Sequence, residues 1–415
     1  MARSIPALVE PSVLRWARES VNLTPLAAAR KMKLPDDRVE QWEAGSATPT
    51  IAQLRKATEV YKRPLAVFFL SEPPTDFDAM RDFRRHQEAK AGEWSPELHG
   101  EYRRAIAQRE AALDLAEIDD APPPTTWRLE PLPGDDEEIA AAARSLLLSQ
   151  SPLSLPKSIG TKYEHLNTWT AALEEAGVLV MATSGGRVAT SEMRAFSLYD
   201  DVLPVIMVNG SDAARGRLFS LLHEYAHLLL HTGGLCDTVT DTKATNADRA
   251  LEARCNAIAA AILMPPGLVL AGPEVAGRRA LPDSWDYPAL REAAAPYGVS
   301  AEAFARRLLT LGRISPNFYQ ARRAEFLAAY AREEDQATTG GGNWYRTTAR
   351  DLGKAFVRRI ADARRRRVID SYTAASFLNV KVDQIDRLAE MALSRSLRDR
   401  PPLLVRHQRV HQGPP

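Results

Sequence analysis

The stretch of sequence that most limits what this chain can fold into is a short apolar segment carrying two histidines. His223 and His227 are four residues apart, so on a helix they project from one face, a turn apart. Buried imidazoles need partners, and a single metal ion can serve both. Five surrounding leucines predict that this helix lies inside its domain: Leu218, Leu221, Leu222, Leu228 and Leu229.

Glu224 follows the first histidine and gives the segment the form His-Glu-x-x-His. A zinc ion lowers the pKa of its bound water toward about 7, and an adjacent carboxylate can take the proton. The five-residue pattern also arises by chance, and a catalytic zinc needs a third protein ligand. The hypothesis of zinc as cofactor, with His223 and His227 as ligands and Glu224 as catalytic base, therefore depends on finding that ligand.

Three residues compete for the third position. His231 lies eight residues after His223, or roughly 12 Å along a helix, so both cannot bind one metal unless the helix breaks. We expect a structural role for His231, or one beside the ligands. Glu252 lies in a second apolar helix and would complete a His₂Glu site, although a charge on a solvated helix face is the alternative interpretation. Asp248 is a weaker substitute.

These two segments together resemble the ImmA/IrrE family of zinc metallopeptidases. The first reads His-Glu-Tyr-Ala-His-Leu-Leu-Leu-His, and the second runs from Glu252 to a closing Ile-Leu-Met-Pro, similar to the family's E-x-x-A-N-x-F-A-x-x-L-L-M-P. The resemblance covers roughly residues 140–330. It implies that Glu252 is the third metal ligand and that Asn256 is the family's asparagine. Cys255 and Ile258 replace the usual Ala and Phe, both as apolar packing changes.

The first 70 residues predict a separate unit of short helices. Thr24 and Pro25 open a helix that extends to about residue 32, and another helix over 36–43 ends at Gly45. With its Trp-Glu-Ala-Gly ending, this pair resembles the Xre/Cro-type helix-turn-helix. In that interpretation Arg38 and Gln41 reach base edges. Three basic side chains would contact DNA phosphates: Lys31, Lys33 and Arg55.

Two carboxylates oppose a role in DNA binding. Asp36 and Asp37 lie at the start of the predicted recognition helix, where they would repel phosphates. A helix-turn-helix that serves protein contact or forms a homodimer is the alternative. The arginine run at 364–367 is another candidate for nucleic-acid contact, but such runs are more often solvated helix faces.

Length and composition describe an ordinary globular protein. The 415 residues allow two or three domains, and the net charge of +1 gives no overall argument for nucleic acid or a membrane as partner. Cys236 and Cys255 are the only cysteines, which excludes a disulfide framework and favours a reducing, cytoplasmic location. Either cysteine is better explained as a small buried hydrophobe than as a metal ligand. No segment reaches signal-peptide or membrane-helix length.

The predicted fold is α+β and mostly helical. We expect an all-α helix-turn-helix domain (1–70), a helical connector with a proline-rich linker (71–135), a zincin-like metallopeptidase domain with a small sheet (136–335), a helical C-terminal domain (343–395) and a disordered tail (396–415). The connector helix is predicted over 96–118. Apolar runs predict strands at 177–181, 194–199 and 203–208, the last two forming a hairpin. Helices in the peptidase domain are predicted at 136–148, 163–176, 213–231, 247–263 and 301–311.

The leading hypothesis is a regulatory zinc metallo-endopeptidase that cleaves one protein partner, such as a helix-turn-helix repressor, with a DNA-binding unit fused to it. The alternative is a non-proteolytic transcriptional regulator or antitoxin of a toxin–antitoxin module, which uses the metal domain for binding or sensing. A purely structural zinc would have no use for Glu224. Tyr225 and Tyr199 are candidates, by residue type alone, for stabilising an oxyanion.

Overall fold

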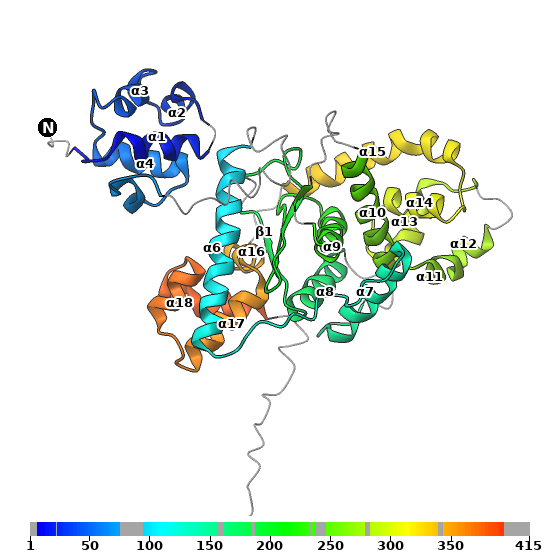
Figure 1. The fold of residues 1–415 in the computed structure, drawn as a ribbon. Coiled ribbons are helices and arrows are strands. Elements are labelled where there is room, and N and C mark those ends of the chain that lie inside the picture. The colour runs from blue at the N-terminus through cyan, green and yellow to red at the C-terminus, as the bar shows by residue number, and fades with distance from the viewer. Residues whose placement is uncertain are drawn as a thin grey trace, which may run out of the picture.

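The structure is a computed structural model. It describes residues 6–21, 23–74, 94–155, 162–184, 187–232, 234–236, 246–278, 283–338 and 343–393. Helices dominate these residues, and four short strands form one sheet (Figure 1). The predicted mostly helical α+β fold is confirmed. The tail predicted at 396–415 lies outside the described residues.

The N-terminal helices enclose a small core of their own. Thr24 caps the second helix, and Thr50 forms a capping box with Gln53 at the fourth. Arg18 and Glu43, both buried, form an ion pair of 2.6 Å that joins the first helix to the third. The elements are α1 (Pro11–Glu19), α2 (Pro25–Lys31), α3 (Arg38–Glu43), α4 (Ile51–Tyr61) and the 3₁₀ turn η1 (Leu65–Phe69). The two helices predicted at 25–32 and 36–43 are thus present as α2 and α3.

The sheet has the strand order β1-β3-β2-β4. Its strands are β1 (Leu179–Ala182), β2 (Ala195–Leu198), β3 (Val205–Val208) and β4 (Gly234–Cys236). The first pairs in parallel with β3, whereas β2 runs antiparallel to both of its neighbours. The predicted hairpin of β2 and β3 is confirmed. The edge strand β4 was not predicted, because three residues are too few to show an alternating pattern.

Alternate residues of the strands face two different cores, as the period of two along a strand requires. On one face Val180, Ala195 and Ile206 pack among α7 (Asp136–Gln150), α8 (Lys162–Glu175), α9 (Ala214–Leu229) and α10 (Asn246–Leu263). On the other, Met181 and Met207 pack with α6 (Pro96–Ile118) and the C-terminal helices. Burial on both faces explains why the strands are almost wholly apolar. The C-terminal elements are α16 (Trp344–Leu352), α17 (Lys354–Arg365), α18 (Ser371–Leu378), η3 (Val382–Gln384) and α19 (Ile385–Ala392).

Five further helices extend the first core beyond α10. They are α11 (Pro266–Ala271), α12 (Pro273–Gly277), α13 (Tyr287–Ala294), α14 (Ala301–Thr310) and α15 (Pro316–Thr338), with the 3₁₀ turn η2 (Ala295–Tyr297) after α13. The helices predicted at 96–118, 136–148, 163–176, 247–263 and 301–311 correspond to α6, α7, α8, α10 and α14. Within the part of the chain that the structure describes, no helix combines the length and apolar character of a membrane span.

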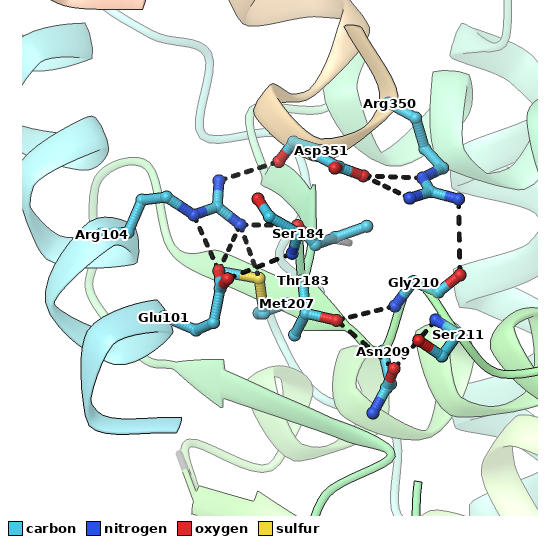
Figure 2. A network of polar contacts seen from close by, with 11 residues as sticks. Glu101, Arg104, Thr183, Ser184, Met207, Asn209, Gly210, Ser211, Arg350 and Asp351 are labelled. Atoms are coloured by element: carbon cyan, nitrogen blue, oxygen red, sulfur yellow. Dashed lines mark hydrogen bonds and ion pairs between the residues drawn. The ribbon is translucent and has the colours of Figure 1, made fainter. Parts of the chain in front are cut away.

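A polar network fixes the ends of β1 and β3 against α6 and α16 (Figure 2). Arg104 of α6 donates to the carbonyl of Asp351 at 3.0 Å and pairs with Glu101 at 2.6 Å. The carboxylate of Glu101 accepts the backbone N–H that follows β1, from Ser184, at 3.1 Å. The carboxylate of Asp351 in turn pairs with its neighbour Arg350, at 2.5 Å. The network therefore fixes the C-terminal ends of β1 and β3, and α9 begins a few residues after the end of β3.

Candidate metal centre

Helix α9 carries the histidines, and all of its residues from Leu221 to Leu229 are buried. Asp212 precedes it and accepts the N–H of Ala213 at 2.7 Å, which places a negative charge at the positive end of the helix. A side chain at Gly216 would meet the carboxylate of Asp212 at 2.6 Å, so this close approach requires glycine. Five leucines of α9 are buried, and the side chains of His223, Glu224 and His227 are buried with them.

The structure brings His223, His227 and Glu252 together. The Nε2 atoms of the two histidines lie 3.2 Å apart. Glu252, reaching across from α10, places its Oε2 3.2 Å from His223 Nε2 and its Oε1 3.3 Å from His227 Nε2. One ligand atom from each residue lies within 4.8 Å of the others. Two imidazoles and a carboxylate in this arrangement could hold a metal ion.

The ring of His227 is held from the side away from the cluster. Its Nδ1 lies 3.2 Å from the hydroxyl of Thr232, and that hydroxyl also donates to the carbonyl of His227 at 3.2 Å. Because the Thr232 hydroxyl gives its proton to that carbonyl, it accepts a hydrogen bond from Nδ1–H of His227. Nε2 then keeps its lone pair for a metal. The sequence analysis missed Thr232, which lies beyond the end of α9 and gives no helical spacing to notice.

The cluster perturbs the pKa values of its own members. Burial lowers the pKa of His227, but hydrogen bonds with Cys255 and Glu252 and the charge of Glu224 outweigh it and raise the value. Burial raises the pKa of Glu252, yet its hydrogen bonds with the two histidines lower the net value. Both shifts favour an ion pair within the cluster, so a metal ion that binds there must displace a proton from His227.

Glu224 is fully buried, and its carboxylate makes one hydrogen bond with the described residues. The hydroxyl of Ser197, on β2, donates to its Oε2 at 2.7 Å. Its other oxygen, Oε1, is buried and has no hydrogen-bond partner among the described residues. Ser197 was not singled out from the sequence. The available signal was a serine within the apolar run Ala-Phe-Ser-Leu, which is an unusual place for a buried hydroxyl.

The remaining polar candidates near the motif lie outside the three-residue cluster. Helix α9 ends at Leu229, and His231 is exposed with a φ of 56°. Its ring stacks on Tyr199 and lies 3.2 Å from that hydroxyl, which also donates to Asp201. The hydroxyl of Tyr225 is buried and donates to the carbonyl of Trp127 at 2.7 Å. Neither tyrosine is therefore free to stabilise an oxyanion in this arrangement.

Residues Asp248 and Asn256 share α10 with Glu252. Asp248 is exposed and does not belong to the metal-type cluster. Asn256 is half-buried. Glu252 is thus the carboxylate of α10 that meets the histidines.

The residues proposed to contact DNA lie on the N-terminal unit. Gln41 donates to the carboxylate of Asp37 at 2.6 Å, and Asp36 pairs with Arg30 at 3.1 Å. Arg38 is half-buried. The three side chains assigned to phosphates are exposed: Lys31, Lys33 and Arg55. This geometry leaves a DNA-binding role as a prediction.

The arginine run of the C-terminal helices is largely ion-paired. Arg364 pairs with Asp386, and Arg366 pairs with Asp119 at 2.5 Å and with Asp362 at 2.8 Å. Paired guanidinium groups have less charge to offer a phosphate. The observation agrees with a solvated helix face.

A comparison with protein-family models bears directly on this centre. Residues 173–309 match the IrrE N-terminal-like domain, a peptidase family. The matched segment extends from α8 to α14 and contains all three residues of the cluster together with Glu224. It covers the central part of the resemblance drawn from the motifs and leaves the N-terminal unit unassigned. Comparisons with curated proteins and with solved structures gave no match.

Proposed function

We propose that this chain is a zinc metallo-endopeptidase that cleaves a specific protein partner in the cytoplasm. The observation that carries the proposal is the convergence of His223, His227 and Glu252 beside a buried glutamate that has one open oxygen. The match to a peptidase domain supports the reaction class.

The spacing of the two imidazoles and the carboxylate supports zinc as the metal. Two ligands at about 2.0–2.1 Å from a zinc ion, and at a tetrahedral angle to each other, lie roughly 3.3 Å apart. The two Nε2 atoms lie 3.2 Å apart, and they lie 3.2 and 3.3 Å from the two different oxygens of the Glu252 carboxylate. Three protein ligands also leave the fourth position open, as a catalytic site requires. The types of the three side chains and their proximity therefore fit a zinc ion.

The chain's own residues supply the proton transfers. A bound zinc ion would polarise the peptide carbonyl and make water acidic enough to ionise near neutral pH. Glu224 accepts the proton of the attacking water and then gives it to the leaving amine. Full burial of this carboxylate excludes bulk water, which strengthens its electrostatic interactions. Thr232 keeps His227 in the tautomer that can bind metal.

The N-terminal unit gives this peptidase a regulatory character in our proposal. A helix pair of the Xre/Cro type would direct the protein to DNA or to a protein partner, and the substrate would be a transcriptional regulator. The second candidate function is a non-proteolytic regulator or antitoxin that binds through the metal domain. The enclosure of the centre favours it, because His223 and His227 are only 6% and 3% exposed.

One experiment tests the proposal and separates the two candidates. Zinc-loaded wild type, Glu224→Gln and His227→Ala are incubated with cell extract, and new protein N-termini are identified by mass spectrometry. We expect a small set of new termini with wild type alone, while Glu224→Gln retains zinc and His227→Ala loses it. Identical termini with wild type and Glu224→Gln would overturn proteolysis by this centre, and their complete absence would favour the non-proteolytic candidate.

A further inference from the structure

Burial of Glu224 carries a cost that one neutral side chain helps to offset. A carboxylate removed from water is unfavourable unless it is hydrogen-bonded, and Glu224 is wholly inaccessible. The hydroxyl of Ser197 is its one described donor, at 2.7 Å. This distance is typical of a short O–H···O⁻ bond, which is stronger than one between neutral groups.

The hydrogen bond makes the two carboxylate oxygens unequal. Oε2 is occupied by Ser197, whereas Oε1 is buried without a hydrogen-bond partner among the described residues. A buried acceptor left open costs free energy. A buried oxygen without a partner on the helix that carries His223 and His227 is useful if something else donates to it, and a reacting water is such a donor.

Ser197 is fixed more firmly than most side chains. Its strand lies inside the sheet, and the residue pairs with Ile206 of β3 on one side and with Gly234 of β4 on the other. Its backbone is therefore held from both directions, and its hydroxyl keeps a single rotatable bond to the strand. Helix α9 packs directly on β2. The sheet thus sets the position of the donor, and the donor limits the rotation of the glutamate.

We propose that Ser197 is a positioning residue for Glu224: it binds Oε2 and thereby keeps Oε1 available for the water that attacks the peptide. This inference rests on the proposed peptidase function and adds a residue from outside the metal-binding motif. The competing explanation is that Ser197 only satisfies a buried carboxylate and has no effect on the reaction.

Spectroscopy of the cobalt-loaded protein tests the positioning without an assay of activity. Cobalt takes zinc-type sites, and its visible absorption depends on ligand geometry. We expect Ser197→Ala and Glu224→Gln to change the spectrum in the same way, with the double variant no different from Glu224→Gln alone. A wild-type spectrum for Ser197→Ala, or additive changes in the double variant, would overturn the proposal.

Kinetics on a peptide that spans a cleavage site found with cell extract completes the test. For Ser197→Ala we expect unchanged zinc content, KM within about twofold, and kcat lower by on the order of 10–100-fold. Ser197→Thr keeps the hydroxyl and should recover most of kcat. Thr168→Val is the matched control, since it removes a buried hydroxyl that bonds to the carbonyl of Glu164 in α8, and it should leave kcat unchanged.

The possible failures are distinguishable. If wild type cleaves nothing, the proposed function fails, while the cobalt spectra still decide whether Ser197 orients Glu224. If wild type cleaves and Ser197→Ala retains full kcat, the peptidase stands and the positioning role is overturned. A loss of kcat that Ser197→Thr does not restore would likewise contradict it.

Discussion

Removal of the metal should destabilise the peptidase core by an amount that can be calculated. A ligand that binds only the folded state stabilises it by about 2.7 kcal/mol at a free concentration of 100 times Kd. The ligands connect α9 with α10 inside the larger of the two cores that border the sheet, so this free energy applies to unfolding of that core. For a unit of 150–250 residues, 1 kcal/mol corresponds to roughly 2–4 °C in Tm. We therefore expect zinc to raise Tm by roughly 5–10 °C.

Thermal unfolding followed by circular dichroism, with zinc or with EDTA, measures this shift. His227→Ala and Glu252→Gln should lose it, because each removes one of the three ligands. Glu224→Gln should keep it, because Glu224 holds no metal and its replacement has nearly the same shape. A full zinc shift in both ligand variants would refute the assignment of the ligands. Loss of the shift in Glu224→Gln would show that the glutamate binds the metal itself.

The same assay has a pH dependence with a definite sign. The pKa of His227 is raised in the metal-free protein, so the proton it holds must leave before zinc can bind. The stabilisation by zinc should therefore grow as the pH rises from about 6 to about 8. A shift that stays constant over this interval would contradict a protonated His227.

Three further predictions concern the frame around the centre. Gly177→Ala should destabilise the protein by more than about 3 kcal/mol, since φ at this residue is 100° and the added methyl would lie 1.7 Å from the carbonyl oxygen of Pro124. Urea unfolding measures the loss, and Gly134→Ala is the control, because a methyl at that position meets nothing within 4 Å. Tyr225→Phe should lower stability by about 1 kcal/mol and leave zinc binding intact, as measured by urea unfolding and metal analysis. Burial and two nearby arginines lower the pKa of His99 to about 4, so its contribution to stability is present above pH 6.5 and is lost as the pH falls toward 4. Urea unfolding of wild type between about pH 7.5 and pH 5 should therefore show a loss about 2 kcal/mol larger than that of His99→Gln, and equal losses would contradict a buried neutral His99.

The parts of the fold that could be predicted are those with local causes. The bounds predicted for α6 were Pro96–Ile118, as observed, because Ser95 and Pro96 form a helix start that can be recognised from sequence. Helix α9 was predicted from its apolar surface and is two residues shorter at its C-terminal end than expected. The two histidines share a face because of helical spacing alone. Glu252 was a candidate because it lies in a second apolar helix and completes a His₂Glu site, and the resemblance of that segment to a family pattern strengthened the choice.

What could not be predicted depends on packing between distant segments. Ser197 matters because β2 lies against α9, and no local pattern reports that contact. Tyr225 was a candidate for oxyanion stabilisation by residue type, yet its hydroxyl is used by a backbone carbonyl far away in the sequence. An amphipathic pattern likewise shows that α6 and the C-terminal helices each have an apolar face. It does not show that both cover the same side of one sheet.

Burial is the property of this His-Glu-x-x-His that argues most against a chance occurrence. A chance match on a surface helix costs nothing, because water satisfies its polar groups. Here Glu224 is fully buried and His227 nearly so, and two imidazoles together with a carboxylate enclosed in an apolar core cost several kcal/mol unless they are paired. Glu252 pairs with both histidines, His227 also hydrogen-bonds with Thr232, and Ser197 donates to one oxygen of Glu224, whereas Glu224 Oε1 has no hydrogen-bond partner among the described residues. A buried glutamate with one unpartnered oxygen lowers stability, and this is the arrangement that the proposed role of Glu224 in proton transfer requires.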